Sequence, residues 1–147
     1  MILDQTEQEI QSPAQRFVLP IRIYYEDTDA GGIVYHASYL RFMERARTDL
    51  LRHLGHERSR LSSELKVQFV VTGMTIKYVK PALLDDLVQV SASVKSLGYA
   101  RLIFDQTVER NGEVLTKASV TAACVKVGGI KPAVIPKSLR EKLKGLM

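Results

Sequence analysis

Two aspartates stand close together in a short segment that is rich in glycine. Asp27 and Asp29 are separated by one threonine, and Ala30, Gly31 and Gly32 follow them. A carboxylate can act as a general base or as a nucleophile, whereas aspartates and glycines in a loop often only shape a turn. The segment therefore predicts either a reactive carboxylate or an ordinary turn, and the elements around it have to decide.

A helix follows this segment and gives the carboxylates a chemical neighbour. Apolar residues recur at helical spacing over residues 39–54, Ser38 is the expected N-cap, and Gly55 is the expected C′ residue. The first N–H groups of a helix have no partner within it and lie at the positive end of its dipole. We therefore expect the helix start to stabilise an oxyanion beside a carboxylate.

This arrangement suits a thioester better than an ordinary ester. The leaving thiolate resembles that of cysteine, whose free pKa is about 8.5, so it departs without strong help from a general acid. A carboxylate and a polarised carbonyl are then sufficient for hydrolysis. The sequence contains no Gly-x-Ser-x-Gly motif, and serine-hydrolase chemistry is therefore unsupported.

The rest of the chain predicts a mostly antiparallel sheet. One strand begins at Phe17 and contains Pro20, which indicates an edge position or a bulge. The alternation of apolar residues changes parity at Gly73, which indicates a β-bulge, and Asn111-Gly112 is a strong hairpin signal. Strand, loop, helix and four further strands predict an α+β fold, with a five-stranded antiparallel sheet curled around one long helix.

Composition and charge narrow the class of protein. The 147 residues are 46% hydrophobic and 25% charged, which fits one ordinary globular domain. The formal net charge is +5, but the basic residues are scattered and no nucleic-acid-binding module is visible, so we expect no nucleic-acid partner. The lone cysteine, Cys124, is expected to be a buried packing residue and cannot form an internal disulfide.

The same sequence predicts a cytoplasmic location. A single cysteine is compatible with a reducing compartment, and the polar, acidic first residues do not form a signal peptide. No apolar stretch approaches the roughly 18 residues that a membrane-spanning helix needs, so we expect no integral membrane segment.

Residues 24–45 contain a longer motif that includes both aspartates. It runs through Asp27-Thr-Asp29 and Gly-Ile-Val-Tyr-His36 to Tyr39. This stretch resembles the signature of the 4-hydroxybenzoyl-CoA thioesterase family. Within that family it is similar to the Tol–Pal-associated, YbgC-like acyl-CoA thioesterases, and weaker similarity extends over residues 17–127. The resemblance implies the hotdog fold, in which an antiparallel sheet wraps around a long central helix, and the predicted order of elements agrees with it.

The resemblance also assigns roles to single residues. Asp29 matches the catalytic carboxylate of the family, whereas Asp27 is expected to order the loop. His36 matches the position whose backbone N–H polarises the thioester carbonyl, and its side chain is a candidate for assisting the reaction. Three further residues are expected to bind substrate: Tyr25, Val34 and Tyr35.

The implied substrate is an acyl-CoA or acyl carrier protein thioester. Basic residues near strand ends, among them Lys80 and above all Arg101, are candidates for binding the CoA phosphates. No cofactor is required, and no metal is expected because His53 and His56 alone cannot complete a metal site. The family further implies a homo-oligomer, a dimer or tetramer with sites at a dimer interface, and the Tol–Pal similarity implies a peripheral, envelope-linked partner.

The expected organisation is a flexible leader over residues 1–15, a hotdog domain over residues 16–130, and a basic C-terminal extension over residues 131–147. Two other functions remain open. An acyl-thioester dehydratase can have the same fold, but its usual motifs, such as His-Phe-Pro, are missing here. A binding or scaffold module would instead recognise a thioester or a protein without turnover.

Overall fold

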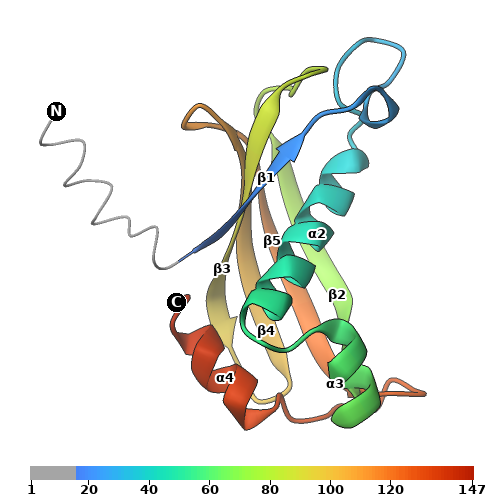
Figure 1. Ribbon diagram of the computed structural model, residues 1–147, viewed down its shortest axis with the longest axis vertical. Coiled ribbons are helices and arrows are strands. Elements are labelled where there is room, and N and C mark those ends of the chain that lie inside the picture. Colours follow the sequence, from blue (N-terminus) through green and yellow to red (C-terminus); the bar gives the residue numbers. More distant parts are fainter. Residues whose placement is uncertain (1–15) are drawn as a thin grey trace, which may run out of the picture.

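The computed structural model describes residues 16–147, so the leader predicted for residues 1–15 lies outside the described residues. A sheet of five strands and the helices that cover it make up this part of the chain (Figure 1). In chain order the elements are β1 (Phe17–Arg22), the 3-10 helix η2 (Tyr25–Asp27), α2 (Ser38–His53), α3 (Arg58–Glu64), β2 (Val67–Tyr78), β3 (Leu87–Leu97), β4 (Arg101–Arg110), β5 (Glu113–Lys126) and α4 (Lys137–Lys144).

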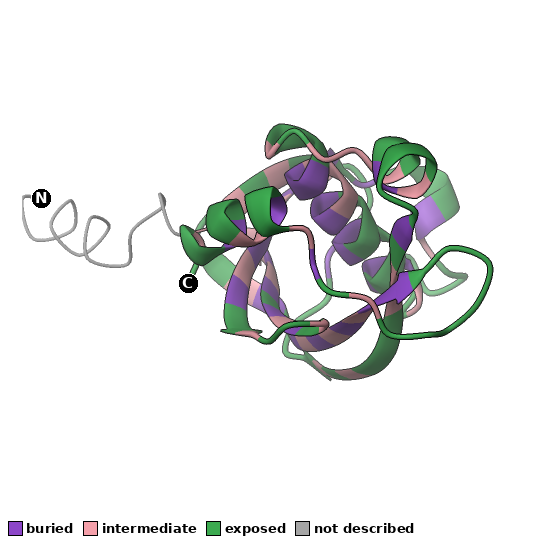
Figure 2. Cartoon of the chain, turned by 90° about the horizontal axis from the view of Figure 1, so that it is seen from below, coloured by how far each residue is buried: buried purple, intermediate pink, exposed green. Residues whose placement is uncertain are grey.

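The strands pair in the order β1-β3-β4-β5-β2, and every pair is antiparallel. Seen from below, the sheet curves around α2, and buried residues line the space between them (Figure 2). This confirms the predicted α+β hotdog architecture. The helix α3 was not predicted; it has seven residues, of which only Leu61 is buried.

Three local signals of the sequence are confirmed in the strands. Pro20 lies on β1, which is an edge strand and pairs only with β3. The pairing of β2 with β5 shifts register between Val71 and Gly73, as the change of parity indicates. Asn111 and Gly112 join β4 to β5 with positive φ angles of 52° and 81°, as a tight hairpin turn requires.

The central helix α2 packs its apolar face against the inner face of the sheet. Phe42, Met43, Ala46 and Leu50 are almost fully buried there. Burying each of the large apolar side chains contributes roughly 1.5–3 kcal/mol. Because this packing fixes the helix against the strands, it also fixes where the helix begins.

The start and end of α2 differ slightly from expectation. Ser38 is the first residue of the helix rather than its N-cap, which is Ala37. The Ser38 hydroxyl does not cap the helix; it donates instead to the Asp27 carbonyl, 3.1 Å away. Gly55 follows the C-cap Leu54 with φ of +82°, so the predicted C′ glycine is confirmed.

The C-terminal segment packs onto the same core as the strands. The C-terminal extension contains α4, and Ile135, Leu139 and Leu143 are fully buried in the main hydrophobic cluster. Among the helices between residues 16 and 147, none has the length and apolar character needed to cross a membrane.

Candidate active site

Asp27 shapes the loop between β1 and α2 from within. Its side chain is buried, and its Oδ2 accepts the Tyr24 N–H at 2.8 Å. Its carbonyl oxygen accepts the Tyr35 N–H at 2.9 Å and the Ser38 hydroxyl. These bonds give Asp27 the loop-ordering role expected of it and leave its carboxylate turned away from solvent.

Asp29 is exposed, and a tight turn holds it. Its Oδ1 accepts the Gly31 N–H at 2.8 Å, and its own N–H donates to the Ile33 carbonyl at 2.9 Å. Gly32 has φ of +83°, and a Cβ at Gly31 would lie only 3.2 Å from Asp29 Oδ1, so both glycines permit this turn. Among the described residues, Asp29 Oδ2 accepts no hydrogen bond. One carboxylate oxygen is thus fixed by the loop and the other is free to react.

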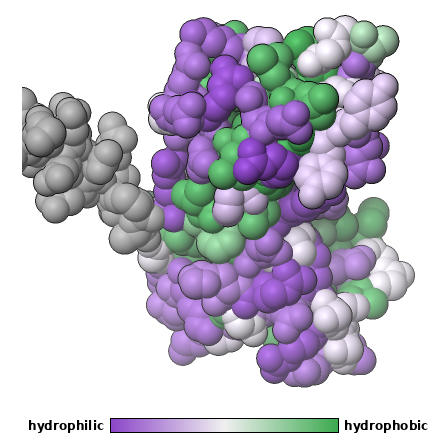
Figure 3. Space-filling model, turned by 45° about the horizontal axis from the view of Figure 1, so that its top comes forward, coloured by the Kyte–Doolittle hydropathy of each residue, from purple (hydrophilic) through white to green (hydrophobic). Residues whose placement is uncertain are grey.

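A cavity of about 300 Å³ lies beside Asp29. The loop, the helix start and the end of β2 all contribute to its walls. The lining residues are Asp29, Ile33, Val34, His36, Tyr39, Tyr78, Val79, Lys80 and Pro81. Apolar surface mixed with polar groups is exposed at this end of the molecule, which Figure 3 brings forward. A group with both an apolar chain and a polar centre fits such walls.

Free backbone donors lie at the start of α2, where His36 lines this cavity. In residues 16–147, the N–H groups of His36 and Ala37 donate to no protein acceptor. The Tyr78 hydroxyl donates to the His36 carbonyl at 2.8 Å and holds this peptide in place. The His36 ring lies between those of Tyr35 and Tyr78, with centroid distances of 4.5 and 6.4 Å. Free N–H groups at a helix start, next to a carboxylate, can polarise a carbonyl.

Comparison with known proteins identifies the family. The family model described as "Thioesterase superfamily" matches residues 31–117, which is more than half of the chain. The chain belongs to the thioesterase superfamily. The match covers α2, strands β2, β3 and β4, and the cavity-lining residues other than Asp29, which lies two residues before it.

Individual relatives within the thioesterase superfamily cover most of the chain. An acyl-CoA thioesterase YbgC from Haemophilus influenzae is 47% identical over 84% of this chain and 91% of that protein. An acyl-CoA thioester hydrolase YbgC from Escherichia coli is 44% identical over 87% of this chain and 96% of that protein. The crystal structure of a probable thioesterase from Bartonella henselae superimposes with a TM-score of 0.79, at 33% identity, over 82% of this chain and 99% of that one.

The structure brings several of the predicted site residues together. Asp29, Val34 and His36 line the cavity, and Lys80 reaches it from the end of β2. Tyr35 does not line the cavity but packs against the His36 ring. Tyr25 lies on η2 with 82% of its surface exposed and does not line the cavity either.

Arg101 is not brought to this site within its own chain. It begins β4, whereas the cavity lies at the end of the sheet where β4 finishes at Arg110. Nine residues of extended strand span about 30 Å, at roughly 3.3 Å per residue. The sequence signal, a basic residue after a turn, does not say which end of the sheet the turn occupies.

Tyr39 and Tyr78 also line the cavity, although the sequence did not predict them as site residues. Tyr39 is buried and its hydroxyl accepts the Ala82 N–H at 3.0 Å, while burial raises the pKa of this phenol. The two rings contact each other with a centroid distance of 5.4 Å. Tyr78 ends the predicted strand just before Pro81, and an aromatic residue at that strand end was the available signal.

Cys124 and the histidines near the end of α2 are remote from this chemistry. Cys124 is buried as predicted, and burial raises the pKa of its thiol to about 11. A thiol with this pKa is a poor nucleophile at neutral pH. Among residues 16–147, no three of the His, Cys, Asp and Glu side chains gather as a metal site would require.

Proposed function

We propose that this thioesterase hydrolyses acyl-CoA thioesters to a free acid and a thiol, with Asp29 as the catalytic residue. The observation that carries the proposal is that Asp29, with one free carboxylate oxygen, lines the same cavity as His36. The N–H groups of His36 and of the next residue, Ala37, are open at this helix start. The names of the relatives from Haemophilus influenzae and Escherichia coli support the acyl-CoA substrate class. An acyl group on an acyl carrier protein presents the same thioester and belongs to the same proposal.

The reaction needs one base, one oxyanion site and one leaving group. Asp29 Oδ2 either takes a proton from a water that attacks the carbonyl carbon, or attacks that carbon itself to form an anhydride that water then cleaves. The N–H groups of His36 and Ala37 hold the oxygen that becomes negative. The carbon–sulfur bond breaks, and the thiolate takes up the proton that water released. The products are a carboxylic acid and a thiol.

The walls of the cavity give the other predicted residues their proposed roles. Val34 contacts the acyl group, and the His36 side chain assists by contacting the thioester from its position between two tyrosines. Tyr25 and Tyr35 are exposed at the same end of the molecule and are proposed to contact the rest of the substrate. Arg101 can meet a CoA phosphate only if a second subunit brings it to the site, because it lies far from the cavity of its own chain.

We also propose that the chain works as a homo-oligomer in the cytoplasm. Strand β2 is an edge of the sheet, and it is 12 residues long with Val71 and Tyr78 exposed on it. A long, exposed edge strand is a template for pairing with another strand. The proposed dimer forms by pairing of β2 with its copy, which puts the cavity near the interface because Tyr78, at the end of β2, lines it. A tetramer, a peripheral envelope-linked partner and the cytoplasmic location remain predictions from the sequence.

Replacing Asp29 with asparagine tests the catalytic assignment. Asn keeps the size of the side chain and can still accept the Gly31 N–H, but it cannot act as a base or as a nucleophile. We expect kcat on acyl-CoA substrates to fall by about 10²-fold or more, as for loss of a general base. Turnover by Asp29→Asn close to that of the unchanged protein would overturn the assignment.

The substrate panel and the control make this experiment specific. The panel runs from short to long acyl chains and includes aromatic acyl-CoAs, and an enoyl-CoA in the same panel reports hydration instead of hydrolysis. Glu26→Gln is the matched control, because Glu26 is an exposed carboxylate in the same loop that does not line the cavity. This variant should keep kcat within about twofold, as expected for a surface change away from the site.

A further inference from the structure

We propose that Arg110, at the end of β4, is a positioning residue for thioester hydrolysis. It holds the β2–β3 loop (residues 79–86), and that loop in turn holds the turn that carries Asp29. The inference rests on the proposed function, since it concerns the geometry of the same site. The side chains of Arg110, Asp86, Glu113 and Lys80 form this clamp, and none of them is part of the family motif in residues 24–45.

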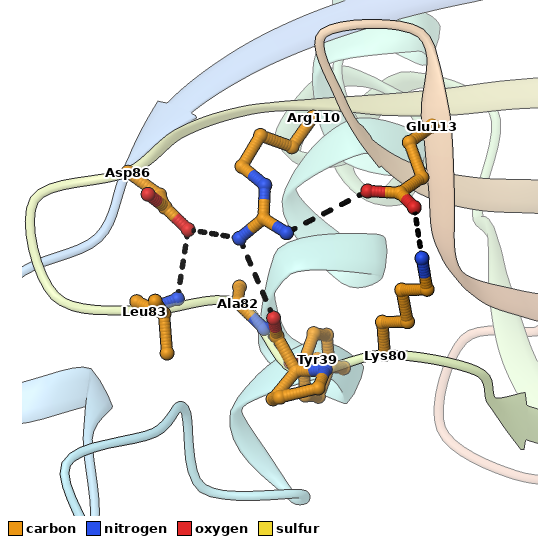
Figure 4. Close-up of polar contacts among 8 residues, drawn as sticks. Tyr39, Lys80, Ala82, Leu83, Asp86, Arg110 and Glu113 are labelled. Atoms are coloured by element: carbon orange, nitrogen blue, oxygen red, sulfur yellow. Dashed lines mark hydrogen bonds and ion pairs between the residues drawn. The ribbon is translucent and has the colours of Figure 1, made fainter.

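Arg110 attaches to the β2–β3 loop at several points. Its Nη1 donates to Asp86 Oδ2 at 2.7 Å and to the Pro81 carbonyl at 3.4 Å. Its Nη2 lies 3.7 Å from Glu113 Oε1, and Glu113 forms an ion pair with Lys80. Figure 4 shows Arg110 between Asp86 on one side and Glu113 on the other, with Lys80 beyond Glu113. The loop is therefore held near both of its ends.

The inner side of the same loop contacts the active site. Asp86 Oδ2 also accepts the Leu83 N–H at 2.8 Å, which closes the loop upon itself. Next to it, the Ala82 carbonyl accepts the Val34 N–H at 3.0 Å, and the Ala82 N–H donates to the Tyr39 hydroxyl. Leu83 forms an isolated antiparallel bridge with Ile33. The loop thus connects the Arg110 cluster to the cavity, whose walls include its first residues, Val79, Lys80 and Pro81.

Ile33 and Val34 connect these contacts to Asp29. The Asp29 N–H donates to the Ile33 carbonyl, and Val34 forms a bridge with Thr28 on the other side of the turn. A change in the β2–β3 loop therefore moves the strand-like segment on which the Asp29 turn closes. A continuous series of direct contacts therefore links Arg110 to Asp29 through Asp86 and the β2–β3 loop.

The ion pair of Arg110 and Asp86 is charged at neutral pH. The side chains of Arg110 and Asp86 are 24% and 21% exposed, so the pair is partly shielded from water. Burial opposes ionisation of Asp86, but hydrogen bonds from the Leu83 N–H and from Arg110 outweigh it and lower the pKa of this carboxyl. The hydrogen bond to Asp86 raises the pKa of Arg110. Arg110 and Asp86 are therefore both charged at neutral pH.

The chain offers a matched control pair on the same strand. Arg16 forms an ion pair with Glu109, the neighbour of Arg110 in β4, at the same distance of 2.7 Å. The Arg16 and Glu109 side chains are 37% and 13% exposed, close to the values of the Arg110 pair. This pair makes no contact with the β2–β3 loop among the contacts of residues 16–147. A substitution at Arg16 therefore measures how much an ion pair at the end of β4 contributes to stability, without an effect on the loop.

The experiment compares Arg110→Gln with Arg16→Gln. In Arg110→Gln we expect kcat to fall at least about tenfold, since small displacements of a catalytic group are costly. KM should change less than kcat, and the Val34 and Ala82 amides should exchange hydrogen faster. Arg16→Gln should lower the melting temperature by a similar amount while kcat and these amides stay unchanged. Arg110→Lys keeps one charge but cannot bridge Asp86, Pro81 and Glu113 together, so its kcat should be intermediate.

Equal effects of Arg110→Gln and Arg16→Gln on kcat would overturn the proposal, and so would unchanged exchange at Val34. If Arg110→Gln does not fold, Arg110→Lys and Asp86→Asn provide the same comparison. The proposed function can fail separately. In that case the unchanged protein shows no acyl-CoA hydrolysis, but faster exchange of the Val34 amide in Arg110→Gln still reports the clamp.

Discussion

The two ends of α2 differ in whether their terminal backbone groups are hydrogen-bonded. At its C-terminal end, Gly55 N–H donates to Arg52 and His56 N–H donates to Leu51, which is the bonding pattern of a Schellman motif. The Leu54 carbonyl there accepts Lys142 Nζ at 2.7 Å. At its N-terminal end, no side chain caps the helix and the N–H groups of His36 and Ala37 find no acceptor in residues 16–147.

This difference separates stability from function within one helix. Unpaired backbone groups cost free energy when they are shielded from water, so a chain under selection for stability alone closes both ends. Here only the C-terminal end is closed. The end that stays open is the one that shares a cavity with Asp29. Changes at the C-terminal end should therefore alter stability without altering turnover, and changes at the N-terminal end should alter both.

The largest expected effect on stability is at the closed end. Leu139 is fully buried in α4, the helix that brings Lys142 to the end of α2. Leu139→Ala removes apolar contacts and leaves a cavity, which should cost about 2–5 kcal/mol of unfolding free energy. Denaturant unfolding measures this loss, and kcat per folded molecule should not change. A fall in kcat per folded molecule would show that the two ends are coupled after all.

A matched pair of glycines gives a sharper test of the comparison. Gly32 and Gly55 have nearly the same left-handed φ, +83° and +82°. A Cβ at Gly32 meets nothing within 4 Å, and one at Gly55 meets only Lys142 Nζ at 3.4 Å. Alanine at either position should therefore cost about 1–2 kcal/mol, mostly from backbone strain.

Only one of these two variants should lose activity. Gly32 closes the turn that places Asp29, so Gly32→Ala should lower kcat by about tenfold or more through displacement of the carboxylate. Gly55→Ala should leave kcat unchanged at a similar loss of stability. Chemical denaturation and a thioester assay on the same preparations measure the two quantities. An equal kcat in both variants would mean that the Asp29 turn tolerates the strain without moving.

Much of the fold follows from local signals. The bulge at Gly73, the hairpin at Asn111-Gly112 and the helix end at Gly55 each depend on backbone conformations that particular residues favour. That Asp29 and His36 lie close together could be predicted because they are seven residues apart in one continuous segment, and both line the cavity. Features that depend on neighbours along the chain are therefore the ones that the sequence predicts well.

The features that were missed depend on contacts between distant segments. Ser38 was expected to cap α2, but its hydroxyl meets the Asp27 carbonyl, which only the folded loop brings near. Arg101 was expected at the site because of its turn, although strand order puts it at the other end of the sheet. Tyr78 reaches the cavity because β2 ends there, and no local pattern encodes that register. The folded loop decides the case of Ser38, and the pairing of remote strands decides those of Arg101 and Tyr78.

The smallest expected effect concerns the charge at the closed end of α2. The Lys142 ammonium group donates to the Leu54 carbonyl and lies at the negative end of the helix dipole. Lys142→Met keeps the apolar part of the side chain but removes the charge, and it should cost about 0.3–1 kcal/mol.

Lys144→Met is the control, because Lys144 lies in the same turn of α4 but contacts Glu141 and not α2. The difference between the two variants in denaturant unfolding isolates the contact with Leu54. It should shrink in about 1 M salt, where the Debye length falls to roughly 3 Å. Neither variant should change kcat, because Lys142 acts at the end of α2 that is farthest from Asp29 and Lys144 does not contact α2. If Lys142→Met slows turnover while Lys144→Met does not, then the charge at the closed end acts on the open end through the helix, and the two ends are not independent.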